Sequence, residues 1–197
     1  MIEDSYKSIS APSEGLYKEK GSKFLAFVFP VESEDQIKTH RDELRKTHFD
    51  ARHHCFAFRL GIKGDRYRMN DDGEPSFTGG KPIYGQILSN ELSDILIVVV
   101  RYFGGTKLGV PGLTRAYKSA AANALENAEI IEKIIKEDVR IKYSYDNTSI
   151  VMHTISDFNL TPEEQTFEED CRMLVKVRLK DLEKFKEEIV KSTEIIK

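Results

Sequence analysis

The stretch Val98–Tyr117 reads VVVRYFGGTKLGVPGLTRAY. Its β-branched run, which ends at Arg101, predicts a buried strand. The glycines that follow indicate a loop, because glycine adopts positive φ and lets the backbone approach a partner closely. Apolar residues that recur at helical spacing from Leu113 onward predict a helix. A strand, a glycine loop and a helix in this order direct backbone N–H groups and a positive helix end toward one point, so the stretch predicts an anion-binding surface.

Three cations and an aromatic ring accompany this loop. The candidate residues for binding an anion or a nucleic acid are Arg101, Tyr102, Gly104, Gly105, Lys107, Gly109, Gly112 and Arg115. The phosphate-loop pattern is only half met, because Val110 and Pro111 stand where it needs Lys and Ser or Thr. The dinucleotide-binding pattern G-x-G-x-x-G is absent, so no nucleotide cofactor is expected. The alternative interpretation is a tight strand-to-helix turn that carries surface charges.

A second group of polar residues lies in the segment Gly61–Gly80, which contains five glycines and is predicted to be a long loop. Its candidate residues are Asp71, Asp72, Glu74 and Thr78. Clustered carboxylates can hold Mg²⁺ or act as acid and base. The run Asp-Asp-Gly-Glu-Pro is also typical of turns, and the calcium-loop spacing is absent. We therefore favour a turn, or a salt bridge to Arg66 or Arg101, over a binding role.

The predicted strand Ala51–Leu60 carries Arg52, His53 and His54, which we regard as further contributors to the anion-binding surface. Adjacent residues of a strand point to opposite faces, so the two histidines cannot easily hold one metal ion. A third ligand at a suitable spacing is missing, and no metal site is predicted.

The charge distribution indicates two domains of different character. The net charge is −3, yet Arg52–Lys118 holds 10 Lys and Arg against 6 Asp and Glu. Residues 136–197 hold 11 Lys and Arg against 14 Asp and Glu. This change in charge predicts a boundary between a first domain, 1–135, and a second domain, 136–197. The second domain follows a β-α-β-β-α pattern typical of a split βαβ, ferredoxin-like unit. The fold class is therefore α+β.

No segment predicts a membrane or secreted location. The strongest apolar run, Ile95–Val100, is too short to span a bilayer, and the N-terminus lacks a secretory signature. Cys55 and Cys171 lack metal-ligand spacing and are interpreted as reduced thiols. We expect a cytoplasmic protein without a membrane partner.

Several spaced motifs strongly resemble the YigZ/IMPACT family, in its bacterial-type two-domain form. They are Asp50–Cys55, Asp71–Ser76, Gly80–Ile83, Arg101–Gly105, Lys107–Gly109, Gly112–Leu113 and Arg115–Tyr117. The resemblance covers the chain from about Gly21 to Leu125. Phe77 and Pro111 depart from the family pattern and make their loops bulkier or stiffer.

The resemblance implies more than the residues alone. It implies that the first domain is similar to the second domain of small-subunit ribosomal protein five. It implies that the second domain is similar to the last domain of elongation factor G. Eukaryotic relatives restrain a translation-initiation kinase pathway that responds to amino-acid starvation, by competing for a ribosome-associated activator.

Three functional hypotheses remain open on the sequence. The first is a non-enzymatic, translation-related regulator that binds RNA, the ribosome or a ribosome-associated factor through the basic glycine-rich loop. The second is a protein-interaction module that acts through the acidic C-terminal domain. The third is an enzyme on a phosphorylated small molecule that uses Asp71, Asp72 and Glu74. The oligomeric state does not follow from any of them.

Overall fold

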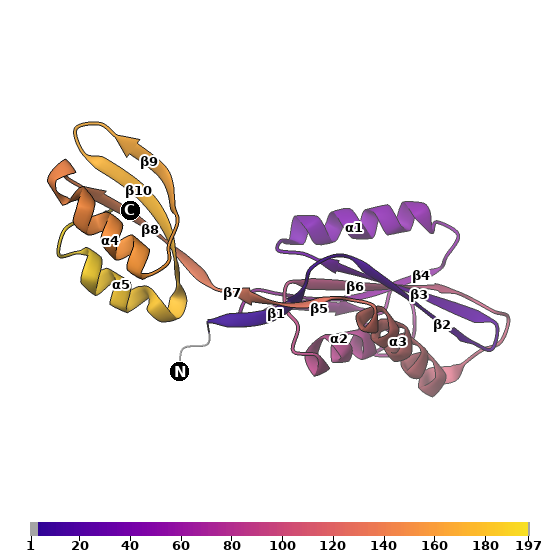
Figure 1. The fold of residues 1–197 in the computed structure, drawn as a ribbon. Coiled ribbons are helices and arrows are strands. Elements are labelled where there is room, and N and C mark those ends of the chain that lie inside the picture. Colours follow the sequence, from indigo (N-terminus) through magenta and orange to yellow (C-terminus); the bar gives the residue numbers. More distant parts are fainter. Residues whose placement is uncertain (1–3, 197) are drawn as a thin grey trace. The chain divides into compact units, whose positions relative to one another are not determined.

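The structure is a computed structural model that describes residues 4–196. The chain folds into two compact units, which Figure 1 shows. Within the described residues, the first unit is Tyr6–Lys133, and the second consists of residues 134–196 together with Asp4 and Ser5. Both units combine helices with antiparallel sheets, so the predicted α+β class is confirmed. None of the helices within residues 4–196 has the length and apolar character needed to cross a membrane.

A five-stranded antiparallel sheet forms the centre of the first unit. Its strands, in spatial order, are β2 (Ser13–Glu19), β3 (Ser22–Pro30), β6 (Ile95–Tyr102), β4 (His53–Leu60) and β5 (Arg66–Asn70). The middle strand β6 is buried from Ile95 to Arg101. Its β-branched residues suit this place, because a strand covered on both faces needs a continuous apolar run.

Helices cover both faces of this sheet. Helix α1 (Glu34–Thr47) packs on one face through Ile37 and Leu44. Helices α2 (Gly80–Ser89) and α3 (Gly109–Glu126) pack on the opposite face, as Figure 1 shows. Because side chains alternate along β6, Val98 and Val100 face α1, while Ile97 and Val99 face α2 and α3.

Small residues let α3 approach the sheet closely. Its fully buried face includes Ala116, Ala120, Ala121 and Ala124. A Cβ atom added at Gly15 of β2 would lie 2.4 Å from the backbone nitrogen of Ala124. The helix begins at Gly109 rather than near Leu113, so the expected glycine loop is shorter than its sequence suggested.

The predicted loop Gly61–Gly80 is partly wrong. It contains β5, which pairs with β4 at the edge of the sheet, and it ends where α2 begins at Gly80. The two remaining strands of this region, β1 (Ser5–Ile9) and β7 (Ile130–Ile134), form a separate pair that the sequence reading did not include.

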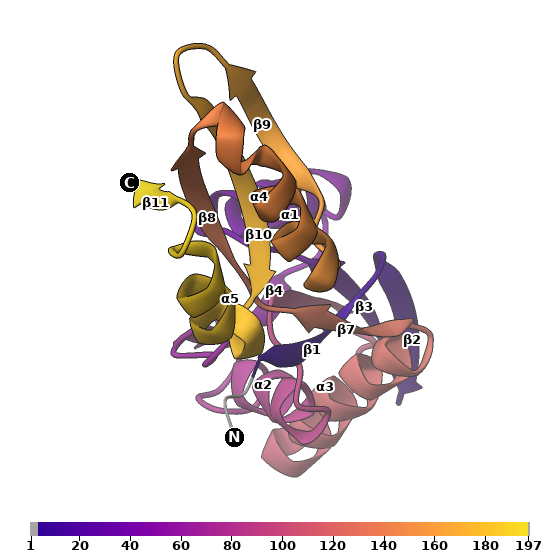
Figure 2. The same cartoon turned by 60° about the vertical axis from the view of Figure 1, so that its left-hand side comes forward.

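The second unit has the order β-α-β-β-α-β. Its elements are β8 (Lys136–Tyr143), α4 (Thr148–Asp157), β9 (Pro162–Phe167), β10 (Cys171–Arg178), α5 (Leu182–Ile189) and β11 (Glu194–Ile196), with 3₁₀ turns at Tyr145–Asn147 and Leu179–Asp181. The antiparallel sheet order is β11-β8-β10-β9. Val151, Ile155, Phe185 and Ile189 pack both helices against the sheet. Figure 2 shows α4 and α5 side by side on one face of this sheet. This arrangement confirms the ferredoxin-like prediction and adds β11 to it.

Candidate anion-binding site

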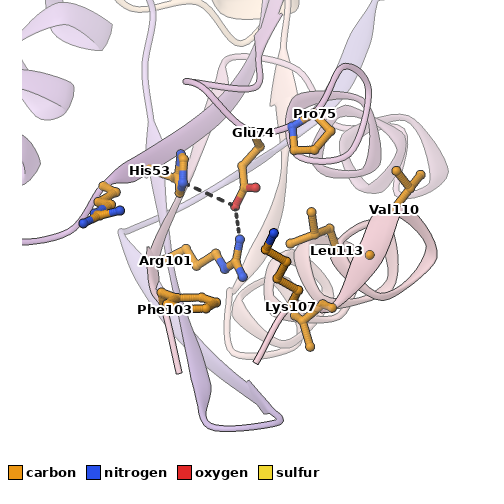
Figure 3. A pocket seen from close by; sticks show the side chains of 11 residues that line it. His53, Glu74, Pro75, Arg101, Phe103, Lys107, Val110 and Leu113 are labelled. Carbon is orange, nitrogen blue, oxygen red and sulfur yellow. Dashed lines mark hydrogen bonds and ion pairs between the residues drawn. The ribbon is translucent and has the colours of Figure 1, made fainter. Parts of the chain in front are cut away.

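A pocket of about 540 Å³ lies where β6 ends, on the face of the sheet that α2 and α3 cover. It is lined by Arg52, His53, Glu74, Pro75, Arg101, Phe103, Lys107, Leu108, Gly109, Val110 and Leu113. Antiparallel pairing of β4 and β6 places His53 opposite Arg101. Figure 3 shows how side chains from β4, the loop before α2, β6 and the start of α3 converge there. We call this the first pocket.

A buried ion pair forms the floor of the first pocket. The Nη1 atom of Arg101 lies 2.6 Å from Oε1 of Glu74, and the two side chains are 7% and 4% exposed. The Tyr117 hydroxyl donates to the same oxygen at 2.9 Å. Burial and the neighbouring charge of Glu74 raise the pKa of Tyr117, so it stays a hydroxyl donor. These bonds hold the guanidinium in place before any ligand binds.

Arg101 retains hydrogen-bonding capacity. Its Nε atom is buried and has no hydrogen-bond partner among the described residues. Its guanidinium carbon lies 5.5 Å from the ring centroid of Phe24 and 5.6 Å from that of Phe103. An unsatisfied buried donor costs about 1–3 kcal/mol. A ligand acceptor that reached Nε would therefore remove a standing cost.

His53 presents one ring nitrogen to the first pocket. Its Nδ1 atom lies 2.9 Å from the carbonyl oxygen of Asp72. A carbonyl can only accept, so Nδ1 carries the hydrogen. The other nitrogen, Nε2, lies 4.0 Å from Oε1 of Glu74. The ring is therefore fixed in orientation, and Figure 3 shows His53 and Arg101 both directed at the Glu74 carboxylate.

Positive charge dominates the first pocket. Arg52, Arg101 and Lys107 contribute three cations and Glu74 one carboxylate, which leaves 3 − 1 = +2. Arg52 and Lys107 are exposed, and neither has an ion-pair partner within the described part of the chain. Gly109 and Val110 bring the N-terminus of α3 to the same wall, although Pro111 supplies no N–H. The pocket therefore suits an anionic group with an apolar portion beside it.

The structure places most of the remaining loop candidates outside the first pocket. Tyr102 points to the opposite face of the sheet, where its hydroxyl donates to Asp50. Arg115 pairs with Glu19 outside the first pocket. Among the four candidate glycines, only Gly109 lines the pocket. Gly104 and Gly105 lie in the connection between β6 and α3, and Gly112 is buried in the first turn of α3.

The predicted acidic group is also dispersed. Asp71 accepts hydrogen bonds from the backbone of Phe77, Gly79 and Gly80 at 2.8–2.9 Å. Asp72 accepts from Arg45 at 2.6 Å and from the backbone of His54 at 2.8 Å. The buried Thr78 hydroxyl donates to the carbonyl of Pro75. Only Glu74 lines the first pocket, and its cation is Arg101, one of the two partners that the sequence reading considered.

These contacts give the acidic residues a structural role. Asp71 closes the turn before α2, and that turn carries Glu74 to Arg101. Within residues 4–196, no group of three His, Cys, Asp or Glu side chains is placed to hold a metal ion. His54, the third β4 candidate, is buried, and desolvation lowers its pKa. It lies outside the lining of the first pocket.

The connection between β6 and α3 depends on Gly104. Its N–H donates to Oγ of Ser22, and an added Cβ would lie 1.9 Å from the carbonyl carbon of Gly21. We expect Gly104→Ala to lower the free energy of unfolding by about 1–3 kcal/mol or more, because the added methyl group forces the backbone around Gly21 to shift. Gly85→Ala is the matched control, since an added Cβ there meets nothing within 4 Å in the middle of α2. Denaturant unfolding should show a loss of stability only for Gly104→Ala. Equal unfolding midpoints for Gly104→Ala and Gly85→Ala would contradict the close contact at Gly104.

Comparisons with known proteins agree with the fold. The family model for the Impact N-terminal domain matches residues 20–125, so the chain belongs to the IMPACT family. An IMPACT family member of Haemophilus influenzae is 28% identical, over 88% of this chain and 85% of that protein. The IMPACT family member YigZ of Escherichia coli is 36% identical, over 62% of this chain and 61% of that protein.

One solved structure also aligns along nearly the whole chain. It is described as the crystal structure of a hypothetical protein. The alignment covers 99% of this chain and 98% of the other, with a TM-score of 0.74 and 24% sequence identity. This likeness shows the fold alone.

Proposed function

We propose that this protein is a cytoplasmic, translation-related regulator that binds RNA through the first pocket. The observation that carries the proposal is the net positive pocket with Arg101 at its floor, held by Glu74 and with Nε unpaired. The family to which the chain belongs supports the link to translation, because the resemblance to its eukaryotic members implies such a role.

The residues of the first pocket match the two chemical parts of a nucleotide. Arg52, Arg101 and Lys107 are the phosphate contacts, and such contacts position a strand without reading its sequence. Phe103 is 57% exposed, so its ring is open for stacking a base. Stacking on an aromatic ring tolerates any base, so this protein should bind single strands with little sequence preference.

The other two hypotheses receive less support. Asp71 and Asp72 are engaged by backbone N–H groups and by Arg45, which leaves them no free geometry for acid–base chemistry on a pocket ligand. A role of the acidic C-terminal domain in protein binding stays a prediction that rests on its 14 acidic against 11 basic residues.

The experiment is a titration of a labelled single-stranded RNA with the full chain, followed by fluorescence anisotropy. Each phosphate contact to a single strand contributes about −0.7 to the slope of log affinity against log salt. Three contacts predict a slope of about −2, and a loss of roughly twentyfold between about 50 mM and about 200 mM salt. Affinity that does not change with salt, or absence of binding at the lower salt, would overturn the proposal.

A further inference from the structure

A second pocket lies on the opposite face of the same sheet. Its volume is about 580 Å³, and it is lined by Leu16, Lys18, Gly21, Lys23, Leu25, His48, Tyr102 and Phe103. Phe103 therefore lines both pockets, at the point where β6 ends. In Figure 3 its ring lies beside Arg101, on the side that faces the first pocket.

The second pocket has the same chemical character as the first. Lys18 and Lys23 are exposed and have no ion-pair partner within the described part of the chain, and none of the lining residues is a carboxylate. Asp50, which does not line the pocket, accepts a hydrogen bond from the Tyr102 hydroxyl at 3.1 Å. Leu16 and Leu25 supply an apolar wall beside these cations.

Fixed polar groups complete the second pocket. The His48 Nδ1 atom lies 2.9 Å from the Tyr102 hydroxyl oxygen. Desolvation, followed by the hydrogen bond to Asp50, raises the pKa of Tyr102, so this hydroxyl stays protonated. When the Tyr102 hydroxyl donates a hydrogen bond to Asp50, its oxygen accepts one from His48 Nδ1, so the three side chains form a connected hydrogen-bonded group.

Strand alternation explains why there are two pockets. Arg101 and Tyr102 are consecutive in β6 and therefore point to opposite faces of the sheet. Each begins one pocket, and Phe103, the next residue, is half exposed between them. The two basic pockets are thus continuous around the end of the sheet through one aromatic ring.

We propose that a single RNA strand passes over the end of β6 and places one nucleotide in each pocket, with Phe103 between them. This inference rests on the proposed function and adds a second subsite, a minimum length and a strand path to it. Cations on both sides match the charge of consecutive phosphates. A single strand bends around such an edge, whereas a duplex is stiff over a much longer distance.

The test compares uridine monophosphate with uridine oligonucleotides of increasing length, on the wild type and on Lys107→Glu and Lys23→Glu variants. Lys118→Glu is the control, because Lys118 is exposed on α3 and lines neither pocket. Both test positions are exposed, and circular dichroism verifies that the variants fold. Isothermal titration measures each affinity.

The proposal predicts a dependence on length. Lys107→Glu should weaken binding of every ligand. Lys23→Glu should weaken the longer strands about threefold or more, and the mononucleotide less, because a single nucleotide can occupy the first pocket alone. Its salt slope with the longer strands should become shallower by about 0.7, the value for one lost phosphate contact. Longer strands that bind Lys23→Glu as well as the wild type would overturn the second subsite and leave the proposed function standing. Failure of every ligand to bind the wild type would overturn the proposed function itself.

Discussion

Replacing Glu74 by alanine should lower the free energy of unfolding by about 3–5 kcal/mol, because it leaves the charge of Arg101 buried without its partner. Glu74 Oε1 receives both the Arg101 guanidinium at 2.6 Å and the Tyr117 hydroxyl at 2.9 Å. The substitution removes both bonds at once and leaves the hydroxyl of the fully buried Tyr117 without its Glu74 acceptor. Urea unfolding followed by far-ultraviolet circular dichroism gives the difference.

Two further variants make this result specific. Glu32→Ala removes an ion pair of similar length, 2.7 Å to Lys133, but Glu32 is 69% exposed. We expect that change to cost no more than about 1 kcal/mol, as exposed pairs do. Glu74→Gln keeps an oxygen acceptor and should fall between the wild type and Glu74→Ala. Equal effects of Glu32→Ala and Glu74→Ala would show that the Glu74–Arg101 pair is not isolated from water.

The stability of this ion pair bears on binding as well. Glu74 fixes the Arg101 guanidinium at the floor of the first pocket, so the arginine loses little side-chain freedom when an anion arrives. The same carboxylate neutralises one of three cations, which limits the affinity for small anions. The first pocket is therefore prepared to hold a phosphate that is joined to a larger ligand.

Local patterns in the sequence predict much of the fold. The β-branched run before Arg101 predicts β6, and the glycine turn at Gly21 predicts the β2–β3 hairpin. Ser33 is observed as the N-cap of α1, with its side chain accepting from the backbone of Gln36. Each of these features depends on residues close together in the chain, so tertiary contacts do not need to be known.

The parts that the sequence did not predict depend on distant contacts. The strand β5 has only five residues, and Tyr67 and Met69 alternate with three polar ones, which is too short a pattern to predict a strand. Its pairing with β4 decides its structure. The strands β1 and β7 pair across more than a hundred residues of intervening sequence. The start of α3 at Gly109 was missed because its first turn contains two glycines and a proline.

In the candidate site, too, local sequence predicts some features, and others depend on distant contacts. Arg101, Lys107, Gly109, Arg52, His53 and Glu74 were all candidates from the sequence, and the structure brings these six into one pocket. Tyr117 was not among the candidate site residues, because no local pattern reveals that its hydroxyl reaches Glu74. Strand alternation could have separated Tyr102 from Arg101 before the structure was known.

The position of the RNA is the central claim, and Lys107 is the residue that tests it best. Lys107 is exposed, lines the first pocket and has no ion-pair partner in the described part of the chain, so its replacement should leave the fold intact. Lys107→Glu removes one phosphate contact and adds a repulsive charge. We expect about a tenfold or larger loss of affinity at low salt, with a salt slope that is shallower by about 0.7.

The decisive measurement is a single-stranded RNA titration at about 50 mM salt with the wild type, Lys107→Glu and Lys118→Glu side by side. Lys118→Glu makes the same change of charge at an exposed residue of α3 that lies outside the first pocket, so it controls for the effect of net charge. The account predicts a large loss for Lys107→Glu and, for Lys118→Glu, an affinity within about twofold of the wild type. Equal affinities of all three proteins, or equal losses in both variants, would contradict binding at this pocket.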